Sequence, residues 1–566
     1  MATKKRYAAN SAGYDIVNGE EWYGTFEYDT TKKETVFNAA GRSIKIGEIF
    51  KDEDGNTLVR IDYIDADKSE QSLVIDRSLL GDKKELLKKL LQAGAMVYDW
   101  SIGILTKCFA LVEAHTDQIS RCHAKTGWSK AGESFAYRGQ SLISNDEVTS
   151  TYVGIYDLNH QGTFDDWLKM VEEQVMGWIP MEVALLIGLS PLVSNLIEDC
   201  RLIFHLMGDS SVGKTTAGVL AVSVAGCPQP SESAKRNNLK EESLHSLLTS
   251  WNGTDNAILG MLNGLDGTII VLDELSKLSD KAELTKILYT FSDGMDKNRQ
   301  KKARVMDKTD VYHTNVLSIG EESLIGKARN ANTGIRMRVC EIRDRFTETA
   351  AQSEAIKKGC YANYGHAVPK MAKYMVKMGR DNILSVYDRQ FESFHTELSS
   401  VGSVSVSSHR LAVFGAVILT TAEIASNALG LSFSMEDIRT FMLKHLVGDG
   451  SSRNVAERAH EALWSYVTQY QAHFIEGNAV VWGKNIDCRG RITDSRKCKG
   501  KEVAFKREVL SNIFRDLGFN NVDVILDTFE TKGWTNHEKG KNYNRRKITA
   551  MDSTTAQAII VVFPDA

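Results

Sequence analysis

The alternation of apolar and polar residues indicates β-structure at the start of the chain. Apolar side chains alternate with polar ones at Ile44 and Ile46 and again at Val59, Ile61 and Tyr63, on either side of an Asp-Gly pair. Two alternating runs around such a pair predict a β-hairpin. After it, leucines recur at helical spacing from Asp82 to Ala93 and the pattern stops at a glycine, which predicts a short amphipathic helix.

The middle of the chain alternates helical patterns with continuous apolar runs. Helical stretches start at Thr163 (FDDWLKMVEEQV) and at Met181 (MEVALLIGLSPLVSNLI), and LIFHLM follows. Two further apolar runs, TIIVLDE at Thr268–Glu274 and NVLSIGEESL from Asn315, are the kind that strands buried on both faces need. GIRMRVCEI at Gly334–Ile342 also has strand-like alternation and places two arginines on it. The pattern therefore predicts an α/β domain.

The last third of the chain is predominantly helical in pattern. Residues 355–475 show helical spacing, interrupted at Ser399–Ser408 by a serine-rich run that reads as a loop. Beyond about residue 485, VAFKREVLSNIFRDLGF and NVDVILDTFETKGW predict two helices, and a basic turn and the strand-like AQAIIVVF follow. This order of helix, helix and hairpin predicts a winged helix. Arg545 and Arg546, with Lys541 and Lys547, would lie on its wing, in contact either with nucleic acid or with a protein.

A glycine-rich loop follows the strand LIFHLM and precedes a helix-compatible stretch, TAGVLAVSVAG. The loop reads GDSSVGKT at Gly208–Thr215, and this strand–loop–helix context is typical of a phosphate-binding loop. Its backbone N–H groups can point at phosphates, Lys214 can reach the β- and γ-phosphates, and Thr215 can bind Mg²⁺. The predicted nucleotide-binding residues are Gly208, Asp209, Ser210, Ser211, Val212, Gly213, Lys214, Thr215 and Thr216.

Two carboxylates stand where the run TIIVLDE ends. Asp273 would hold the Mg²⁺ together with Thr215, and Glu274 would polarise the attacking water, as in a Walker-B strand. Because ELSKL follows, the same acids could instead cap a helix. Further along, Ser318 stands near the end of the next apolar strand, where a hydroxyl could orient the water or the γ-phosphate. Either Arg336 or Arg338 could serve as an arginine finger that a neighbouring subunit donates, although each could also form an ordinary surface ion pair.

Composition and charge argue against a membrane-spanning, secreted or broadly basic nucleic-acid-binding protein. The 566 residues carry a net charge of −4 and an estimated pI of 6.4, so any contact with nucleic acid must be local. No apolar run is long enough to cross a bilayer, and the basic N-terminus has no apolar segment behind it, so we expect a cytoplasmic protein without membrane contact. The eight cysteines are scattered singly, which indicates reduced thiols.

Taken together, these motifs resemble those of one known protein family. GDSSVGKTTAGVLAVSVAGCP, SWNGTDNAILGML, TIIVLDELSKL and NVLSIGEESL, with TGW at Thr126–Trp128, resemble the AAA+ replication helicases of phages, integrative elements and staphylococcal cassette chromosomes, which are similar to minichromosome-maintenance helicases. The resemblance covers roughly residues 100–430. It implies an α/β AAA+ P-loop ATPase core, a ring that is a hexamer, ATP and Mg²⁺ at sites between subunits, and a channel that grips DNA. It also implies that Ser318 is sensor 1 and favours Arg338 as the finger, with Arg410 as a possible second sensor.

The same resemblance gives the basic run at Lys297–Arg304 a role, because in such helicases a hairpin between the Walker-B strand and sensor 1 projects into the channel. Lys301, Lys302 and Arg304 are the predicted contacts to DNA phosphates. The predicted function is a hexameric DNA helicase that replicates a mobile element, moving 3′ to 5′ on single-stranded or forked DNA, with an initiator or primase as a possible partner. The alternatives are an AAA+ remodeller or helicase loader that acts on a protein, and a P-loop kinase of small molecules.

The predicted organisation has four parts. It comprises an N-terminal β-rich α+β region at 1–160, the ATPase core at 161–350, a helical lid region at 351–480 and a winged-helix-like domain at 481–566.

Overall fold

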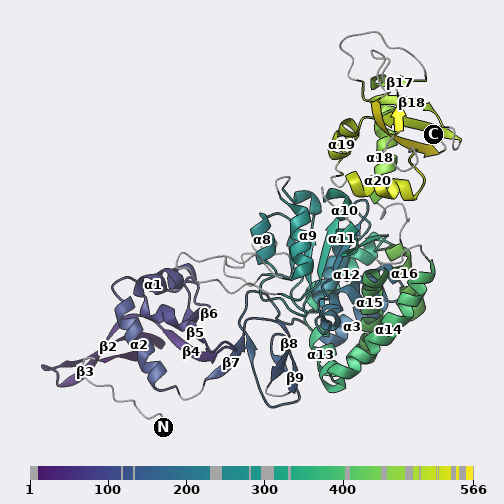
Figure 1. Cartoon of the computed structure of the whole chain (residues 1–566). Coiled ribbons are helices and arrows are strands. Elements are labelled where there is room, and N and C mark those ends of the chain that lie inside the picture. The colour runs from purple at the N-terminus through teal and green to yellow at the C-terminus, as the bar shows by residue number, and fades with distance from the viewer. Residues whose placement is uncertain are drawn as a thin grey trace.

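A computed structural model of the chain shows an N-terminal part and a C-terminal part at opposite ends of a larger central part (Figure 1). The three parts have separate hydrophobic cores, which hold buried residues of about 12–109, 137–446 and 459–563. The structure describes residues 11–116, 119–131, 134–229, 245–279, 282–294, 312–328, 333–401, 408–447, 455–477, 488–495, 499–517, 519, 522–536, 544–546 and 556–564.

The N-terminal part is the predicted α+β region. One antiparallel sheet holds β1 (Ser11–Val17), β2 (Glu20–Asp29) and β3 (Glu34–Arg42), and a second has the order β11-β7-β4-β5-β6, formed by β4 (Ile44–Lys51), β5 (Thr57–Ile64), β6 (Glu70–Asp76), β7 (Ser120–His123) and β11 (Thr151–Tyr152). The 3-10 helix η1 (Arg77–Gly81) leads to α1 (Lys83–Gln92) and α2 (Ile102–Ala114). The predicted hairpin is the antiparallel pair β4–β5, and the predicted helix is α1, which Asp82 caps by accepting from the N–H groups of Lys84 and Glu85.

A second small sheet, formed by residues that follow α2 in the chain, packs on the hydrophobic core of the central part. It consists of β8 (Gly127–Ala131), β9 (Ser134–Arg138) and β10 (Leu142–Ile143). The Trp128 indole donates to the Leu192 carbonyl at 2.7 Å, and the buried Tyr137 hydroxyl donates to the Gly267 carbonyl at 3.0 Å. Tyr137 and Tyr156 belong to the central core, so this small sheet packs with the central part, although β11, which follows it, pairs with β7 of the N-terminal sheet; the sequence suggested one division at 160.

The centre of the molecule is a five-stranded parallel sheet. Its order is β13-β14-β15-β12-β16, with β12 (Ile203–Met207), β13 (Leu248–Ser250), β14 (Ile270–Asp273), β15 (Val316–Gly320) and β16 (Val339–Arg343). Its helical elements are α3 (Phe164–Gln174), α4 (Ile179–Leu189), α5 (Pro191–Ser194), α6 (Lys214–Ser223), α8 (Asp255–Gly260), η2 (Leu275–Lys277), α9 (Leu284–Asp293), α10 (Leu324–Lys327) and α11 (Thr333–Arg336). In a parallel sheet the carboxyl ends of all strands meet at one edge, where ligands of such sheets bind.

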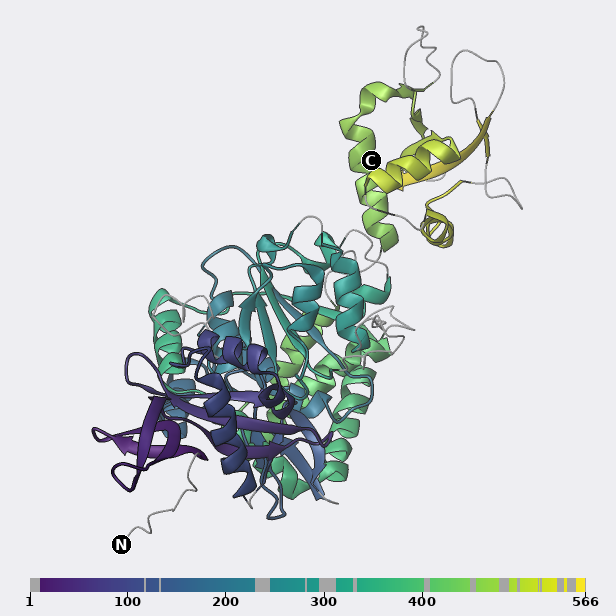
Figure 2. The ribbon, with the colours of Figure 1, turned by 90° about the vertical axis from the view of Figure 1, so that its left-hand side faces the viewer.

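A helical bundle completes the central part (Figure 2). It contains α12 (Ala350–Ala362), α13 (Ala367–Met378), α14 (Arg380–Val401), α15 (Ser408–Leu429) and α16 (Met435–Val447). In the described part of the chain, one stretch, His409–Leu429 of α15, passes the length and hydropathy test for a membrane span, with a mean hydropathy of 1.5; 72% of its window is buried. It packs against α4, α5, α13, α14 and α16, as a core helix does.

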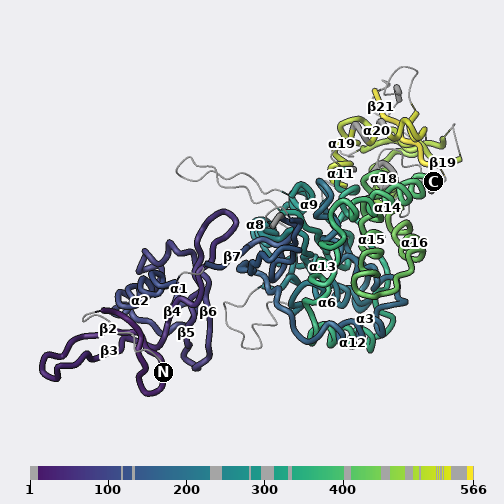
Figure 3. The backbone as a smooth tube through the Cα atoms, turned by 90° about the horizontal axis from the view of Figure 1, so that it is seen from below, coloured from purple at the N-terminus to yellow at the C-terminus, as the bar shows by residue number. Residues whose placement is uncertain are grey.

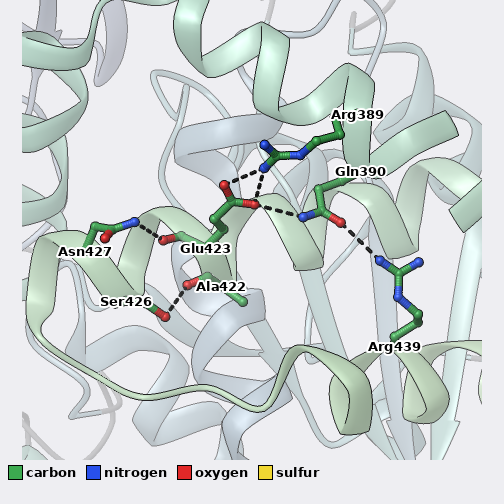
Figure 4. Close-up of polar contacts among 7 residues, drawn as sticks. All are labelled: Arg389, Gln390, Ala422, Glu423, Ser426, Asn427 and Arg439. Atoms are coloured by element: carbon green, nitrogen blue, oxygen red, sulfur yellow. Dashed lines mark hydrogen bonds and ion pairs between the residues drawn. The ribbon is translucent and has the colours of Figure 1, made fainter. Parts of the chain in front are cut away.

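A polar relay joins three helices of this bundle (Figure 4). The Glu423 carboxylate on α15 accepts hydrogen bonds from Arg389 at 2.6 Å and from the Gln390 amide at 2.8 Å, both on α14. The Gln390 carbonyl accepts in turn from Arg439 of α16 at 3.2 Å. Because each polar group is paired, the relay fixes the register of the three helices.

The C-terminal part begins earlier than the sequence suggested (Figure 3). It comprises α18 (Val455–Gln469), η3 (Gln471–His473), β17 (Phe474–Glu476), β18 (Gly490–Asp494), β19 (Gly500–Phe505), α19 (Arg507–Asp516), α20 (Val522–Thr531), β20 (Asn544–Arg546) and β21 (Ala556–Pro564). The two predicted helices are α19 and α20, and β20 pairs with β21 as the hairpin. Ala459, Leu463 and Val467 of α18 belong to this part's core, which therefore includes a helix that the boundary at 481 left out.

Candidate nucleotide site

The glycine loop between β12 and α6 has the backbone of a phosphate cradle. Gly213 has φ +90°, and Ser211, which is not a glycine, is also left-handed with φ +68°. A Cβ at Gly213 would lie 2.5 Å from the Thr347 hydroxyl oxygen and 2.8 Å from its backbone nitrogen. Glycine is therefore required at 213 both by the conformation and by the close approach of the chain after β16.

Lys214 at the start of α6 lies inside this loop. Its side chain is 8% exposed, and its ammonium donates to the carbonyls of Gly208 at 2.8 Å and Asp209 at 2.7 Å. Burial lowers the pKa of the amine from its ordinary value, although Glu321, Asp273 and Asp209 oppose the shift. The ammonium is thus held at the loop by two neutral carbonyls, which phosphate oxygens can replace with a stronger, charge-assisted contact.

The two predicted carboxylates lie at the carboxyl end of β14. Asp273 accepts from the Glu274 N–H at 2.7 Å and is hydrogen-bonded to Thr215, and burial raises its pKa above the ordinary value. Glu274 has a left-handed backbone with φ +59° and forms an ion pair with Lys277. Although Glu274 precedes η2, its side chain makes no capping hydrogen bond, so capping does not explain this acid.

These residues line one pocket of about 860 Å³. Eight predicted residues line it, namely Ser210, Ser211, Gly213, Lys214, Thr215, Thr216, Asp273 and Glu274. Gly208, Asp209 and Val212 belong to the same loop but are not part of the lining. The pocket thus combines a buried ammonium, loop and helix N–H groups, a hydroxyl and two carboxylates, which is the set of donors and acceptors that a nucleoside triphosphate and Mg²⁺ require.

The structure does not bring Ser318 into this pocket. Ser318 is fully buried in β15, where its hydroxyl oxygen accepts from the Trp251 indole at 3.1 Å and lies 2.9 Å from Nδ1 of His205. The residue that lines the pocket beyond this strand is Glu321, whose charge opposes the lowering of the Lys214 pKa. The signal for Glu321 was its place directly after the strand's last residue, Gly320.

Two basic residues of the pocket were not anticipated. Arg345 follows β16 and Lys357 lies on α12, and both line the pocket. The segment around Arg345 lies against the glycine loop, because Phe346 donates its N–H to the Val212 carbonyl at 2.8 Å and the Trp178 indole donates to the Arg345 carbonyl at 3.2 Å. The position of Arg345 just past the end of a parallel strand could have identified it.

The two candidate finger arginines differ in burial and in their surroundings. Arg336 is 1% exposed and ends α11, and β16 begins only at Val339, so the predicted strand alternation through both arginines is wrong. The side chain of Arg338 is 27% exposed and lies on α9, with its guanidinium 3.7 Å from the Asp293 carboxylate and 5.1 Å from the ring centre of Tyr289. Arg338 does not line the pocket of its own chain.

The remaining predicted residues lie elsewhere. Lys301, Lys302 and Arg304 lie outside the described residues, as do Lys541 and Lys547. The wing arginines Arg545 and Arg546 lie in β20. Arg410 is exposed in α15 and is not among the pocket residues.

The chain belongs to the family described as "Domain of unknown function (DUF927)", whose pattern matches residues 18–309, and residues 454–566 match the Cch helix turn helix domain. The fold is similar to that of a solved structure described as "SCCmec type IV Cch - active helicase", with 22% identity, a TM-score of 0.71 and coverage of 99% of this chain and 98% of that one. These findings confirm the expected resemblance to a staphylococcal cassette chromosome protein.

Two structures of the NrS-1 C-terminal region cover 71% of this chain and 92% of theirs, at 13% and 11% identity with TM-scores of 0.26 and 0.22. No match was found among curated proteins.

Proposed function

We propose that this chain is an ATP-dependent DNA helicase of a mobile genetic element, with an AAA+ core that works as a hexamer and moves 3′ to 5′. The observation that carries the proposal is the 860 Å³ pocket, which Lys214 of the glycine loop lines together with Asp273 and Glu274 at the carboxyl end of β14. The shared fold with a Cch helicase and the matched Cch helix turn helix domain support DNA as the polymer on which the pocket acts.

The roles of the residues follow from their places. Lys214 and the loop N–H groups would hold the β- and γ-phosphates, and Thr215 and Asp273, already hydrogen-bonded to each other, would hold Mg²⁺. The metal would supply charge neutralisation on the phosphates. Glu274 would orient and polarise the attacking water, and Glu321, which follows β15 and lines the pocket, would assist it in place of the buried Ser318.

Further roles involve a neighbouring subunit, DNA and a protein partner. Arg338 of one subunit would complete the site of its neighbour, because an arginine at the transferred phosphate stabilises the charge of the transition state. Lys301, Lys302 and Arg304 would contact DNA phosphates in the channel of the ring. An initiator or primase would bring the ring to its origin.

The test is displacement of one strand from a forked duplex by the full chain with ATP and Mg²⁺. Lys214→Ala should lower ATP turnover and strand displacement by about 10² to 10³-fold, because one of the preorganised charges at the phosphates is lost. Lys169→Ala, which removes an exposed lysine of α3 that pairs with Glu173, is the matched control and should behave as the unaltered chain. Lys301→Ala with Lys302→Ala should spare basal turnover and weaken its stimulation by DNA.

Absence of strand displacement by the unaltered chain, in every oligomeric form, would contradict the helicase proposal. Turnover stimulated by a protein and not by DNA would favour a remodeller or loader instead.

A further inference from the structure

Two aromatic side chains of the N-terminal part are exposed next to each other. Trp100 is 65% exposed and Tyr98 is 52% exposed, and both lie in the turn between α1 and α2. Their rings are nearly parallel, with an interplanar angle of 5° and centroids 6.4 Å apart. Exposed rings leave apolar faces in water, which a stacking ligand can cover.

The turn that carries the two rings is fixed by hydrogen bonds. Ser101, which is fully buried, accepts from the Tyr98 N–H at 3.2 Å and lies 3.1 Å from the Tyr98 carbonyl. Its hydroxyl also lies 2.8 Å from that of Tyr23, a buried residue of β2, and Ile102 donates its N–H to the Tyr98 carbonyl at 3.1 Å. The rings are therefore presented by a preorganised turn, which reduces the entropy lost on binding.

Amino groups lie on the same surface. The Lys83 ammonium lies close to Gly103, 3.7 Å from where a Cβ of that glycine would be. Gly103 comes three residues after Trp100, and Lys107 comes four residues after Gly103. Helical hydrogen bonding already begins at the Tyr98 carbonyl, so Trp100, Gly103 and Lys107 share one side of the chain. Lys83 and Lys107 are exposed, and neither forms an ion pair with another described residue.

We infer that Tyr98, Trp100, Lys83 and Lys107 form a platform for single-stranded DNA, on which bases stack against the rings and phosphates contact the amino groups. The choice of DNA as the ligand rests on the proposed function. Stacking requires unpaired bases, because the bases of a duplex have no free faces for rings at a protein surface.

The charges favour nucleic acid over a protein partner. The exposed lysines of α1, Lys84, Lys88 and Lys89, extend the positive charge beyond Lys83, whereas lysine is depleted at the cores of protein interfaces. Acidic groups are also close: Asp99 lies between Tyr98 and Trp100 in the sequence, and Glu85 lies 3.8 Å from the Lys88 ammonium. The platform therefore keeps a net positive charge suited to one strand of phosphates.

The experiment measures binding of a fluorescein-labelled oligo-dT to the full chain by anisotropy, over a series of salt concentrations. Tyr98→Ala with Trp100→Ala should weaken binding about tenfold to a hundredfold, because the stacking of one or two bases is lost. Trp100→Phe keeps a ring and should bind nearly as the unaltered chain does. Tyr28→Ala removes a tyrosine that is 50% exposed on β2 and serves as the matched control, with no expected change.

A second readout separates stacking from general damage. An oligonucleotide that contains 2-aminopurine should lose fluorescence on binding to the unaltered chain, and this quenching should disappear in the ring variant. Lys83→Ala with Lys107→Ala should lower the slope of log affinity against log salt by about 1.4, since two phosphate contacts are removed.

ATP turnover without DNA should be unchanged in all these variants, because the pocket residues are intact. If the unaltered chain hydrolyses ATP and displaces strands while the ring variant binds oligo-dT normally, this inference is wrong and the proposed function stands. Binding of a protein at this surface with unchanged DNA affinity would also overturn it. Failure of the unaltered chain to displace strands would instead count against the proposed function.

Discussion

The two carboxylates at the end of β14 have different surroundings although they are adjacent in sequence. Asp273 is held by the Glu274 N–H and by Thr215, and burial raises its pKa, whereas Glu274 extends toward solvent with Lys277. Burial favours the protonated form of the Asp273 carboxylate, which is the acid that would hold Mg²⁺. Of the two acids, Asp273 should therefore control the dependence on metal.

This difference predicts a pH-dependent requirement for Mg²⁺. The folded-state pKa of Asp273 lies above its ordinary value, so the carboxylate gains its proton at a higher pH than an exposed aspartate does. Below that pKa the Mg²⁺ concentration for half-maximal ATP turnover should rise about tenfold per pH unit, because a ligand must lose its proton before it binds metal. Turnover assays with titrated Mg²⁺, from neutral pH down to the lowest pH at which the protein stays folded, measure this.

Binding of ATP without metal, in the presence of a chelator, is the control and should not follow the same curve. A metal requirement that stays constant throughout that range would contradict the role of Asp273.

The glycine loop and the acids could be predicted at residue level, because their chemistry fixes both residue type and order. Ser318 could not, because successive side chains of a strand point to opposite faces. β15 is buried throughout, so its sequence does not reveal which side faces the pocket. The register pairs Ser318 with His205 of β12, and the Ser318 hydroxyl lies 2.9 Å from Nδ1 of that histidine.

At the scale of elements, the segment after β16 connects the glycine loop to the helical bundle. Thr347 and Phe346 both donate their N–H groups to the Val212 carbonyl, and Arg345 lines the pocket. Asp344, one residue earlier, accepts from Lys444 of α16 at 3.0 Å and lies 3.4 Å from Nε2 of His445. Burial raises the pKa of Asp344, but the hydrogen bonds from Lys444 and from the Arg345 N–H, together with the charges of Lys444 and His445, lower it overall.

Loss of this anchor should weaken nucleotide binding. Asp344→Asn and Lys444→Met should each raise the KM for ATP roughly two- to fivefold, because an ion pair of this exposure contributes about 1 kcal/mol at most. The kcat should change little, since Lys214, Asp273 and Glu274 keep their places. Steady-state turnover over a range of ATP concentrations separates the two constants.

Glu423→Gln is the matched control, because it disturbs contacts among α14, α15 and α16 that do not reach the pocket. It should lower the thermal midpoint without raising the KM. Equal KM values for all three variants would show that α16 does not position Arg345.

Most elements could be predicted from periodicity, among them α1, α3, β12, β14, β15, α19 and α20. The connection from α11 to β16 could not, because GIRMRV has apolar residues at positions compatible with either a helix or a strand. Local pattern also does not show which core an element joins. α18 is helical like the bundle before it, yet Leu463 packs against the sheet of the C-terminal part.

At the scale of the whole molecule, Arg338 is separate from the pocket of its own chain. If a neighbouring subunit uses it, the phosphate-binding Lys214 and the Arg338 of one site come from different chains. Lys214→Ala and Arg338→Ala proteins should then be inactive alone, while their mixture should recover part of the ATP turnover. Recovery arises at sites that pair an intact Lys214 with an intact Arg338.

Turnover of mixed subunits, after exchange at low salt, measures this recovery, and a mixture of Lys214→Ala with Lys214→Ala/Arg338→Ala is the control that should stay inactive. No recovery in the first mixture, from proteins that assemble normally, would contradict a shared site.

The place where Arg338 rests has one more consequence. Asp293 and Tyr289, which hold it, belong to the last two turns of α9, and the basic run at 297–304 follows in sequence. If Arg338 serves a neighbour's nucleotide as proposed, it must leave Asp293 and Tyr289, and the end of α9 then loses both contacts. In the proposed ring, the state of one nucleotide site would therefore change how the end of α9 is held in the adjacent subunit.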